Sequence, residues 1–350
     1  MHGRDARDTL MGRIQRLFHH SLVRLLVVIV NYRTADLTVD CLGSLADQID
    51  SLPGARVVIT DNASGDDSVE KLNRAIARTG WSAWATLLPL DRNGGFAFGN
   101  NAAIRPALQS ADPPDYVLLL NPDTLVLPGA INALLEFMDA HREVGIAGSR
   151  LEHPDGTPQR SAFRFHSVLG ELESGMRLGF VSRLLKNRIV APPVPAAAGP
   201  TDWVAGAGMI VRREVFSQIG LMDEGYFMYF EEVDFCLRAS RAGWPCWYVP
   251  QSRVIHLVGQ SSGVTDAKRS RKRRPAYWFA SRKRFFRKNL GRGKMLLANL
   301  AWAGAFASYR LRRPLQRKPD TDPAWLLWDF LRYNAISHRA ERFTTEARRH

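Results

Sequence analysis

The stretch that most constrains the fold is Asp115-Tyr-Val-Leu-Leu-Leu-Asn-Pro-Asp-Thr-Leu-Val126. Its apolar residues 116–120 are too few for an ordinary helix and are apolar on both faces, as in a strand buried inside a sheet. Pro122 cannot donate a backbone hydrogen bond, so the strand ends there. Asp123 then stands where ligands collect, outside the carboxyl end of a strand in an open α/β sheet. An ordinary solvated turn is the alternative explanation of Asn-Pro-Asp.

The same order of buried strand, polar stop and helix recurs through the first half of the chain. The predicted strands cover residues 24–32, 55–61, 83–90 and 116–120, and the predicted helices cover about 34–45, 68–79, 128–141 and the residues after 93–101. Alternation at this spacing is typical of crossover units on a mainly parallel sheet. Parallel strands end at one edge, so we expect a nucleotide-sized site there that contains Asn31, Asp61, Asn93 and Asp123.

Neither common phosphate-binding loop accompanies these strands. Gly-x-Gly-x-x-Gly does not follow the first strand, and Gly-x-x-x-x-Gly-Lys-Ser/Thr occurs nowhere in the chain. Dinucleotide binding and P-loop chemistry therefore lack their phosphate cradle. A diphosphate bound at this edge would need a divalent cation, and Asp123 is well placed to hold one.

The second half of the chain is less regular. Residues 191–200 are rich in proline, which excludes both a helix and a central strand and predicts a loop. A strand is expected over residues 203–212, and a helix over residues 231–241.

That helix carries three carboxylates near its start. Glu231, Asp234 and Arg238 would share one face, and Glu232 would point about 100° away from them, which leaves its carboxylate free for a different task. Acidic residues in a first helical turn also interact well with the helix dipole, so this pattern alone has a purely structural explanation.

Seven short motifs occur in a fixed order along the chain. They are Val-Ile-Val-Asn-Tyr (28–32), Asp-Asn-Ala-Ser-Gly-Asp (61–66), Asn-Gly-Gly-Phe-Ala-Phe-Gly-Asn-Asn (93–101), Asn-Pro-Asp (121–123), Gly-Ala-Gly-Met-Ile-Val-Arg-Arg (206–213), Phe-Glu-Glu-Val-Asp-Phe-Cys-Leu-Arg (230–238) and Val-Ile-His (254–256). Together they resemble the family 2 glycosyltransferases, most closely the bacterial rhamnosyltransferase-like branch, over about residues 25–290.

The resemblance implies a GT-A fold, an α/β architecture with a mainly parallel sheet, and an inverting transfer from a nucleotide-diphosphate sugar. Asp61 matches the family aspartate that contacts the nucleobase, and Asp66 and Asn93-Gly94 would lie near the nucleoside. The complete predicted donor-binding set is Asn31, Asp61, Asp66, Asn93, Gly94, Asn121 and Arg238.

The resemblance also implies a metal site. Asp123 matches the last aspartate of the family's Asp-x-Asp motif, while Asn121 replaces the first, so the site has one carboxylate fewer. His256 matches a histidine that can complete the metal or diphosphate site. Oxygen ligands suit Mg²⁺ or Mn²⁺, and a neutral imidazole leans toward Mn²⁺.

For catalysis, Glu232 falls where the family often has the aspartate that acts as general base. Glutamate keeps the carboxylate and extends its reach by one methylene. Glu231 is the competing candidate, and Asp234 is expected to support the base. Trp203 could present a flat face to an acceptor sugar, although a tryptophan of the core is the alternative.

Charge is distributed unevenly. The whole chain carries a net +14, whereas residues 268–350 alone hold 23 Lys and Arg against 5 Asp and Glu. Residues 295–305 form an apolar stretch flanked by Lys294 and Arg310, short of a membrane span but suited to a membrane interface. Polybasic segments beside such a helix bind anionic lipid. No recognised nucleic-acid fold accompanies the basic run, so nucleic acid is not an expected partner. The expected partner is an anionic inner-membrane surface. The structural alternative is a helical subdomain packed on the core.

Three cysteines in no metal-binding spacing argue for a reducing compartment. The apolar run at 25–30 is too short for a signal peptide core, so we expect a cytoplasmic protein, peripheral on the inner face of the plasma membrane. The predicted organisation is a basic arm (1–23), a GT-A domain (24–265) and a basic helical extension (266–350).

The sequence therefore predicts a metal-dependent inverting glycosyltransferase that extends a cell-envelope glycan or a lipid-linked acceptor, with dTDP-L-rhamnose as one candidate donor. A transferase that uses a UDP-hexose or UDP-galactofuranose is the alternative within the same class. A non-catalytic nucleotide-sugar-binding scaffold at the membrane is the alternative from a different class.

Overall fold

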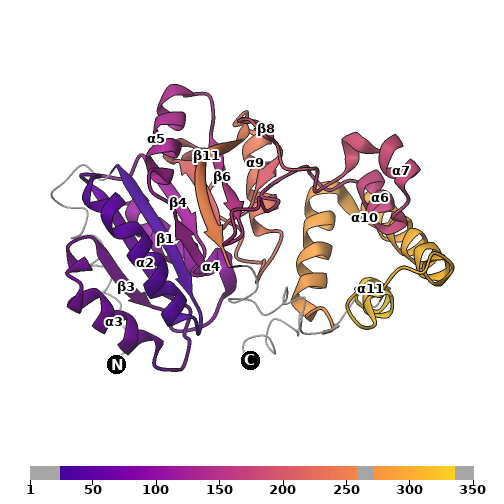
Figure 1. The fold of residues 1–350 in the computed structure, drawn as a ribbon, viewed down its shortest axis with the longest axis horizontal. Coiled ribbons are helices and arrows are strands. Elements are labelled where there is room, and N and C mark those ends of the chain that lie inside the picture. The colour runs from indigo at the N-terminus through magenta and orange to yellow at the C-terminus, as the bar shows by residue number, and fades with distance from the viewer. Residues whose placement is uncertain (1–23, 258–271, 336–350) are drawn as a thin grey trace.

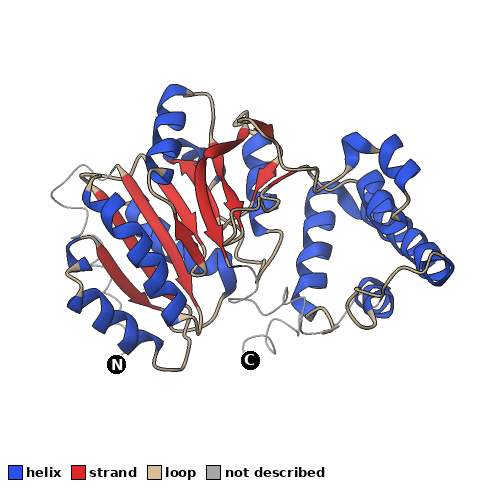
Figure 2. Ribbon diagram, in the orientation of Figure 1, coloured by secondary structure: helices blue, strands red, loops and turns tan. Residues whose placement is uncertain are grey.

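The computed structural model describes residues 24–257 and 272–335. The predicted basic arm (1–23) and most of the basic run at 267–274 lie outside the described residues. The described chain forms a mixed sheet covered by helices on both faces, and a second group of helices beside it (Figures 1 and 2).

The large sheet has nine strands in the order β3-β2-β1-β4-β10-β6-β11-β5, and β8 pairs with β11 off this path. β1 pairs in parallel with β2 and β4, β2 with β3, and β6 with β11, whereas β10 runs antiparallel between β4 and β6. The strands of this sheet are β1 (Leu25–Asn31), β2 (Ala55–Asp61), β3 (Ala85–Pro89), β4 (Tyr116–Leu120), β5 (Thr124–Val126), β6 (Ile146–Glu152), β8 (Gly199–Thr201), β10 (Gly208–Arg212) and β11 (Cys246–His256).

Helices link the strands of this sheet and cover it. They are α2 (Ala35–Asp50), α3 (Ser68–Arg78), the 3₁₀ turn η1 (Trp81–Ala83), α4 (Gly95–Leu108), α5 (Ala130–Ala140), α8 (Arg213–Ile219) and α9 (Glu231–Arg241). The predicted mainly parallel α/β sheet is confirmed, as is the helix over residues 231–241.

Alternation along the buried strands explains the two covered faces. In β1, Leu25, Val27 and Ile29 pack with α2, α3 and α5, whereas Leu26 and Val28 pack with α4, α8 and α9. Successive side chains of a strand point to opposite faces, so a strand that is apolar throughout requires cover on both. The strands of this sheet therefore present their polar ends, rather than a face, to ligands.

Two predicted strands differ from the structure in a way that the chain path explains. The predicted strand at 83–90 begins as a 3₁₀ turn and is extended only from Ala85. The predicted strand at 203–212 is two strands, because β9 (Trp203–Val204) pairs with β7 (Ala162–Phe163) in a small separate sheet, whereas β10 joins the large one. The predicted loop at 191–200 is correct up to 198, where β8 follows.

The remaining helices form a separate group, which we call the helical unit. It consists of α6 (Val168–Met176), α7 (Gly179–Leu184), the 3₁₀ turn η2 (Lys186–Arg188), α10 (Ala276–Leu315) and α11 (Leu326–Ala335). Figure 1 shows α6 and α7 lying beside α10, although a hundred residues separate them in sequence. The basic C-terminal helices therefore pack with an insertion from the middle of the chain.

A buried ion pair joins the two parts of this unit. Arg282 of α10 donates to Glu171 of α6 at 2.7 Å, and both side chains are almost fully buried. His166 also contacts the Glu171 carboxylate, at 3.1 Å. Burial alone would raise the pKa of Glu171, but the Arg282 charge and the His166 hydrogen bond outweigh it and lower the pKa to about 2. Removing one partner from such a pair leaves an uncompensated buried charge, so the pair fixes how α6 docks on α10.

α10 is two helices joined at a single residue. Gly291 has φ 83° and ψ 166°, outside the helical region, and this conformation suits glycine because it has no side chain. In the part of the chain that the structure describes, no helix is both long enough and apolar enough to cross a bilayer.

Candidate functional site

The ends of β1 and β2 meet in a buried hydrogen-bond network. Asn31 lies opposite Asp61 in the parallel register and donates to its carboxylate at 2.7 Å. Ser64 donates to the same carboxylate from its hydroxyl (2.5 Å) and its backbone amide (3.0 Å). The side-chain oxygen Oδ1 of Asn31 accepts hydrogen bonds from the hydroxyls of Thr34 and Thr38, both at 3.0 Å. Both predicted donor-binding side chains are therefore fixed by the fold, and the hydroxyl of Thr34 binds Asn31 rather than capping α2.

Asp66 lies at the exposed end of the same turn. Its carboxylate accepts a hydrogen bond from the backbone of Ser68 at 3.0 Å, and the hydrogen bond from the Ser68 side chain is the main cause of its lowered pKa. Asp66 is thus a solvent-accessible anion close to the buried Asp61.

The glycine turn after β3 links this edge to the segment that precedes α9. Asn93 accepts from the amide of Gly95 at 3.0 Å, and Asn62 donates to the carbonyl of Gly95 at 3.0 Å. The amide of Phe96 donates to the carbonyl of Phe227 at 3.0 Å. Gly95 has φ +85°, and a side chain there would place its Cβ 1.7 Å from the Phe227 oxygen, so the turn requires glycine.

The neighbouring Gly94 is restricted for a different reason. A Cβ at this position would lie 2.3 Å from the ring of Phe98, one turn into α4. The guanidinium of Arg92 lies over the Phe98 ring, 4.3 Å from its centroid. The turn that contains Asn93 and Gly94 is therefore tightly packed. The predicted contact with a donor would be made by its backbone groups and by the Asn93 side-chain amide.

The two predicted metal ligands come from distant parts of the chain and meet. His256, the last residue of β11, lies opposite Thr124 of β5, and its Nε2 is 3.5 Å from a carboxylate oxygen of Asp123. Asn121 approaches the same Nε2 at 3.4 Å. Asp123 is 1% exposed, and Gln159 fixes the backbone of His256 with a 2.7 Å hydrogen bond.

A carboxylate and an imidazole at the carboxyl edge of a sheet are a suitable partial donor set for Mg²⁺ or Mn²⁺. Among the described residues there is no group of three or more His, Cys, Asp or Glu side chains that could hold a metal. Asp123 and His256 are therefore two candidate side-chain ligands that the structure brings together.

α9 begins in a strained backbone. Tyr229 and Phe230, immediately before it, both have left-handed conformations, with φ of 68° and 69°. Bulky aromatic residues adopt this region rarely, and such strain collects at functional sites. Glu231 and Glu232 follow these residues at the start of α9, and one carboxylate oxygen of each is buried without a hydrogen-bond partner in the described structure.

The two glutamates differ in acidity. Burial raises the pKa of Glu232 to about 7. Burial also raises the pKa of Glu231 well above its ordinary value, and the nearby Glu232 charge raises it further. The negative charge of one carboxylate therefore disfavours ionisation of the other. A carboxylate whose pKa is near the working pH is an efficient general base.

Asp234 and Arg238 lie one turn further along α9 and are fully engaged by the protein. Asp234 is 0% exposed and accepts from Tyr226, Arg238, Lys288 and Asn289, at distances between 2.8 and 3.2 Å. Arg238 also donates to the carbonyls of residues 219 and 221, at 2.6 and 2.8 Å. These contacts tie α9 to α10, and direct roles in catalysis and donor binding stay predictions.

Trp203 is held on one face and at its nitrogen. Its ring stacks on Phe163 at 4.1 Å between centroids, and its Nε1 donates to the carbonyl of Arg164 at 3.0 Å. Both contacts are made at the small β7–β9 sheet, and the indole also packs against the buried clusters beside it. A contact between Trp203 and an acceptor stays a prediction.

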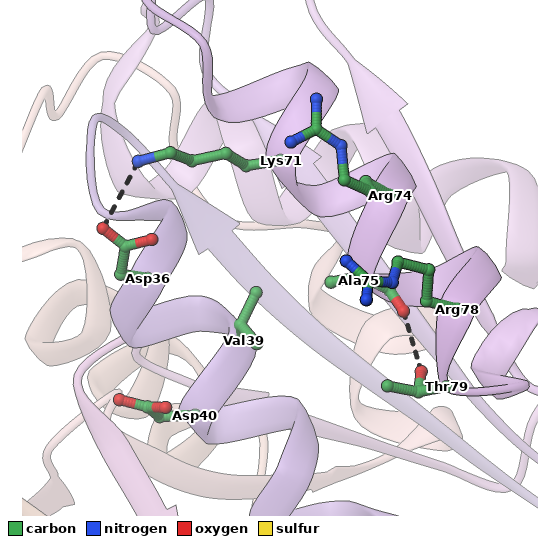
Figure 3. A pocket seen from close by; sticks show the side chains of 8 residues that line it. All are labelled: Asp36, Val39, Asp40, Lys71, Arg74, Ala75, Arg78 and Thr79. Atoms are coloured by element: carbon green, nitrogen blue, oxygen red, sulfur yellow. Dashed lines mark hydrogen bonds and ion pairs between the residues drawn. The ribbon is translucent and has the colours of Figure 1, made fainter.

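A shallow groove elsewhere on the surface is separate from this site. Figure 3 shows it between α2 and α3, lined by Asp36, Val39, Asp40, Lys71, Arg74, Ala75, Arg78 and Thr79. None of the predicted site residues lines it. Lys71 closes its upper end by a 3.4 Å contact with Asp36.

The link between Phe227 and the glycine turn could not be read from the sequence, although the sequence contains both motifs. The double glycine was the available signal, because a glycine that packs against another backbone usually permits a close approach. Its partner lies more than a hundred residues away and carries no complementary pattern.

Known protein families and individual proteins are similar to this chain. The family model described as "Glycosyltransferase like family 2" matches residues 23–289. The N-acetylglucosaminyl-diphospho-decaprenol L-rhamnosyltransferase of Mycobacterium tuberculosis is 30% identical over 225 residues, which are 60% of this chain and 69% of the relative. Rhamnosyltransferase WbbL of Escherichia coli is 29% identical over 47% of this chain and 61% of its own.

Solved structures agree on the fold. The mannosyltransferase PcManGT from Pyrobaculum calidifontis, in complex with GDP-Man and Mn²⁺, has a TM-score of 0.53 and 16% sequence identity over 97% of this chain and 91% of its own. GalNAc-T7 with UDP, GalNAc and Mn²⁺ has a TM-score of 0.53 at 15% identity, over 93% of this chain and 58% of its own.

Proposed function

Because this chain belongs to the family 2 glycosyltransferases and has the GT-A fold, we propose that it transfers a sugar, with inversion, from a nucleotide-diphosphate donor to a hydroxyl of a cell-envelope glycan or lipid-linked acceptor. The observation that carries the proposal is the hydrogen bond from the backbone amide of Phe96 to the backbone carbonyl of Phe227. It joins the strand edge that holds the predicted donor residues to the loop that ends at the buried glutamates.

In the proposed mechanism, Glu232 acts as the general base. Its carboxylate accepts the proton of the acceptor hydroxyl, while the hydroxyl oxygen bonds to the anomeric carbon and the bond from that carbon to the donor diphosphate breaks. Attack on the face opposite the leaving group inverts the configuration. Burial of this carboxylate raises its pKa and so its basicity, and the buried rings of Tyr226 and Phe230 would help to exclude water.

The leaving diphosphate gains negative charge in this step. We propose that Asp123 and His256 hold Mg²⁺ or Mn²⁺, which supplies positive charge to the diphosphate when bound. Asn31 and Asp61 would shape the nucleobase pocket, with Asp66 and the Asn93-Gly94 turn at its rim. Trp203 would lie on the acceptor side.

The donor is proposed from the relatives. Two of them are named as rhamnosyltransferases, and a third, from Shigella flexneri, is named as a dTDP-rhamnosyl transferase, 24% identical over 50% of this chain. This supports dTDP-L-rhamnose ahead of a UDP-hexose or UDP-galactofuranose. A relative from Haloferax volcanii named as a hexosyltransferase, at 27% identity, keeps the UDP-hexose alternative in the test.

Thermal unfolding with dTDP, UDP, GDP and CDP, each with and without Mn²⁺ or Mg²⁺, tests the donor. Specific binding stabilises the folded state by about 2.7 kcal/mol at a hundredfold excess over Kd. We expect the melting temperature to rise most with dTDP plus metal. A larger rise with UDP would replace rhamnose by a UDP-sugar. Binding without turnover on any donor and acceptor would favour the scaffold.

We further propose that the protein acts on the cytoplasmic face of the membrane through α10. After Gly291, five leucines of α10 are between 56% and 86% exposed: Leu296, Leu297, Leu300, Leu311 and Leu315. Counted at 3.6 residues per turn, they fall within an arc of about 100°. An exposed apolar stripe of this length on one face is typical of a helix that lies in a membrane interface.

Positive charge beside the stripe supports an anionic bilayer as its occupant. Arg292 and Lys294 are exposed at its beginning. Two tryptophans at and just before the next helix, α11, are also exposed, Trp325 at 70% and Trp328 at 60%. Tryptophan and basic residues are the side chains that anchor proteins at the level of lipid headgroups.

Replacing Leu297, Leu300 and Leu311 together by Gln tests this surface. Each buried leucine contributes about 1.5–3 kcal/mol, so the partition coefficient onto vesicles that contain phosphatidylglycerol should fall more than tenfold. Co-flotation with such vesicles measures it, and pure phosphatidylcholine vesicles are the control. The leucines are exposed, so the melting temperature should stay unchanged. Undiminished flotation of the folded variant would refute the assignment.

A further inference from the structure

A cluster of arginines lies where the end of α6, the end of α10 and residues 320–322 meet. Arg177 donates to Asp322 at 2.9 Å, and Arg310 contacts Asp320 at 2.7 Å and Asp322 at 3.7 Å. Arg313 contacts Asp320 at 3.3 Å. Two carboxylates thus serve three guanidinium groups, and the cluster keeps an excess of positive charge.

Arg274, just before α10, adds a fourth guanidinium beside this cluster. It stacks over the Trp278 ring at 4.3 Å from the centroid, and its Nε is buried without a hydrogen-bond partner. Arg274 forms no ion pair or hydrogen bond with any residue in the described ranges. In contrast, the neighbouring Arg273 donates from its Nε and Nη2 to the two carboxylate oxygens of Asp329. Burial lowers the pKa of Arg274 and the Arg177 charge lowers it further, whereas Tyr229 and the Asp322 charge act in the opposite direction.

Buried polar groups in proteins nearly always have partners, and a guanidinium taken out of water without an anion is unfavourable. Arg274 is half-buried and its Nε is buried without a partner, so the excess charge and this unpartnered donor point to an anionic ligand. A planar guanidinium held flat on an aromatic ring presents its N–H groups edge-on, the geometry that binds phosphate through two hydrogen bonds.

The position of Arg274 relates this anion to the candidate base. Tyr277, one turn further on, stacks on Tyr229 at 6.1 Å and lies 5.3 Å from the Phe227 ring. Phe227 and Tyr229 belong to the loop that ends at Glu231 and Glu232. The backbone of this loop contacts the glycine turn on the donor side, whereas its rings contact Tyr277 on the side of the helical unit. Arg274 is therefore on the helical-unit side of the loop, the side on which we place the acceptor.

We propose that Arg274, with Arg177 behind it, binds the phosphate of a lipid-linked diphosphate acceptor and holds the acceptor glycan against the candidate base. The inference rests on the proposed transferase function and adds a residue that recognises the acceptor. A diphosphate could also come from the donor, so the test separates these two sources.

Steady-state kinetics of the full chain compare Arg274→Ala with Lys272→Ala, a matched loss of one exposed positive charge two residues away. Two acceptors carry the same glycan, one on a lipid diphosphate and one on a neutral alkyl chain. We expect Arg274→Ala to raise KM for the diphosphate acceptor at least tenfold, and to leave both KM for the alkyl acceptor and KM for the donor within twofold. Lys272→Ala should behave as wild type.

Three results would overturn the assignment. Equal losses with both acceptors would mean that Arg274 is structural. A raised KM for the donor would mean that the anion belongs to the nucleotide. Unchanged kinetics would mean that Arg274 binds no substrate.

A second measurement does not depend on turnover. Calorimetric titration with geranyl diphosphate, in the absence of divalent metal, should give a Kd at least tenfold weaker for Arg274→Ala than for wild type and Lys272→Ala. If wild type transfers no sugar to either acceptor but this difference in Kd is found, the proposed function fails and the anion site stands. Equal Kd values for all three proteins would refute the site.

Discussion

Replacing Glu232 by Gln is expected to lower kcat by about 10²–10⁴-fold, the usual contribution of a general base, while nucleotide binding is retained. The amide has nearly the same shape but cannot accept the proton of the acceptor hydroxyl. Initial rates measured with saturating donor and acceptor give kcat, and thermal shifts with the nucleotide give binding. Glu231→Gln is the matched control, and a larger loss in that variant would make Glu231 the base.

The pH dependence of this variant carries a second expectation. Burial raises the pKa of Glu232 to about 7, so wild-type kcat should rise with pH through about 7 as the carboxylate ionises, and this rise should be absent in Glu232→Gln. A raised folded pKa means that the folded state binds the proton more tightly than the unfolded state, so stability is lost as pH rises from the unfolded value toward 7. The variant should therefore be at least as stable as wild type at pH 8. A less stable variant would indicate that Glu232 is structural.

Replacing Asp123 by Ala should remove the metal-dependent part of nucleotide binding. Asp123 is the buried carboxylate beside His256, and two protein ligands leave little redundancy. We expect the extra rise in melting temperature that metal gives with nucleotide to disappear, and kcat/KM to fall by more than 10²-fold. Isothermal titration of Mn²⁺ into the nucleotide complex measures the loss directly.

Asp115→Ala is the matched control, because this exposed carboxylate precedes the same strand at its opposite end. His256→Ala should give a smaller loss, since the carboxylate stays. A variant at position 123 that keeps full metal dependence would contradict the metal assignment and leave the donor site to be located elsewhere.

Local pattern was enough to predict the first half of the fold. Strands β1, β2 and β4 are apolar on both faces, and each ends at a polar residue, so their positions, their parallel pairing and the gathering of Asn31 and Asp61 at one edge all follow. The predicted strand at 203–212 failed because its two parts pair with different sheets, and pairing partners are not encoded locally.

The candidate site divides in the same way. The strand ends could be predicted, because the carboxyl ends of parallel strands must meet. The contact of Phe227 with the glycine turn, and the capture of Asp234 by Lys288 and Asn289, depend on segments far apart in the chain that carry no shared pattern. The unpartnered donor of Arg274 could be recognised only once its surroundings were known.

The shared construction of the helical unit has a consequence for biosynthesis. α6 ends at Met176, and its partner α10 begins at Ala276, so about a hundred residues must be translated between them. At about 5–20 residues per second, the face of α6 that α10 will cover waits on the order of 5–20 s after it leaves the ribosome. Glu171 meets Arg282 only after this delay. The region between the two segments supplies β10, α9 and β11, so the sheet can close before α6 meets α10, and the helical unit can be completed only after α10 and α11 have been made. Its assembly on the nascent chain is thus a late event, at a time when a nearby bilayer can already compete for its apolar surfaces.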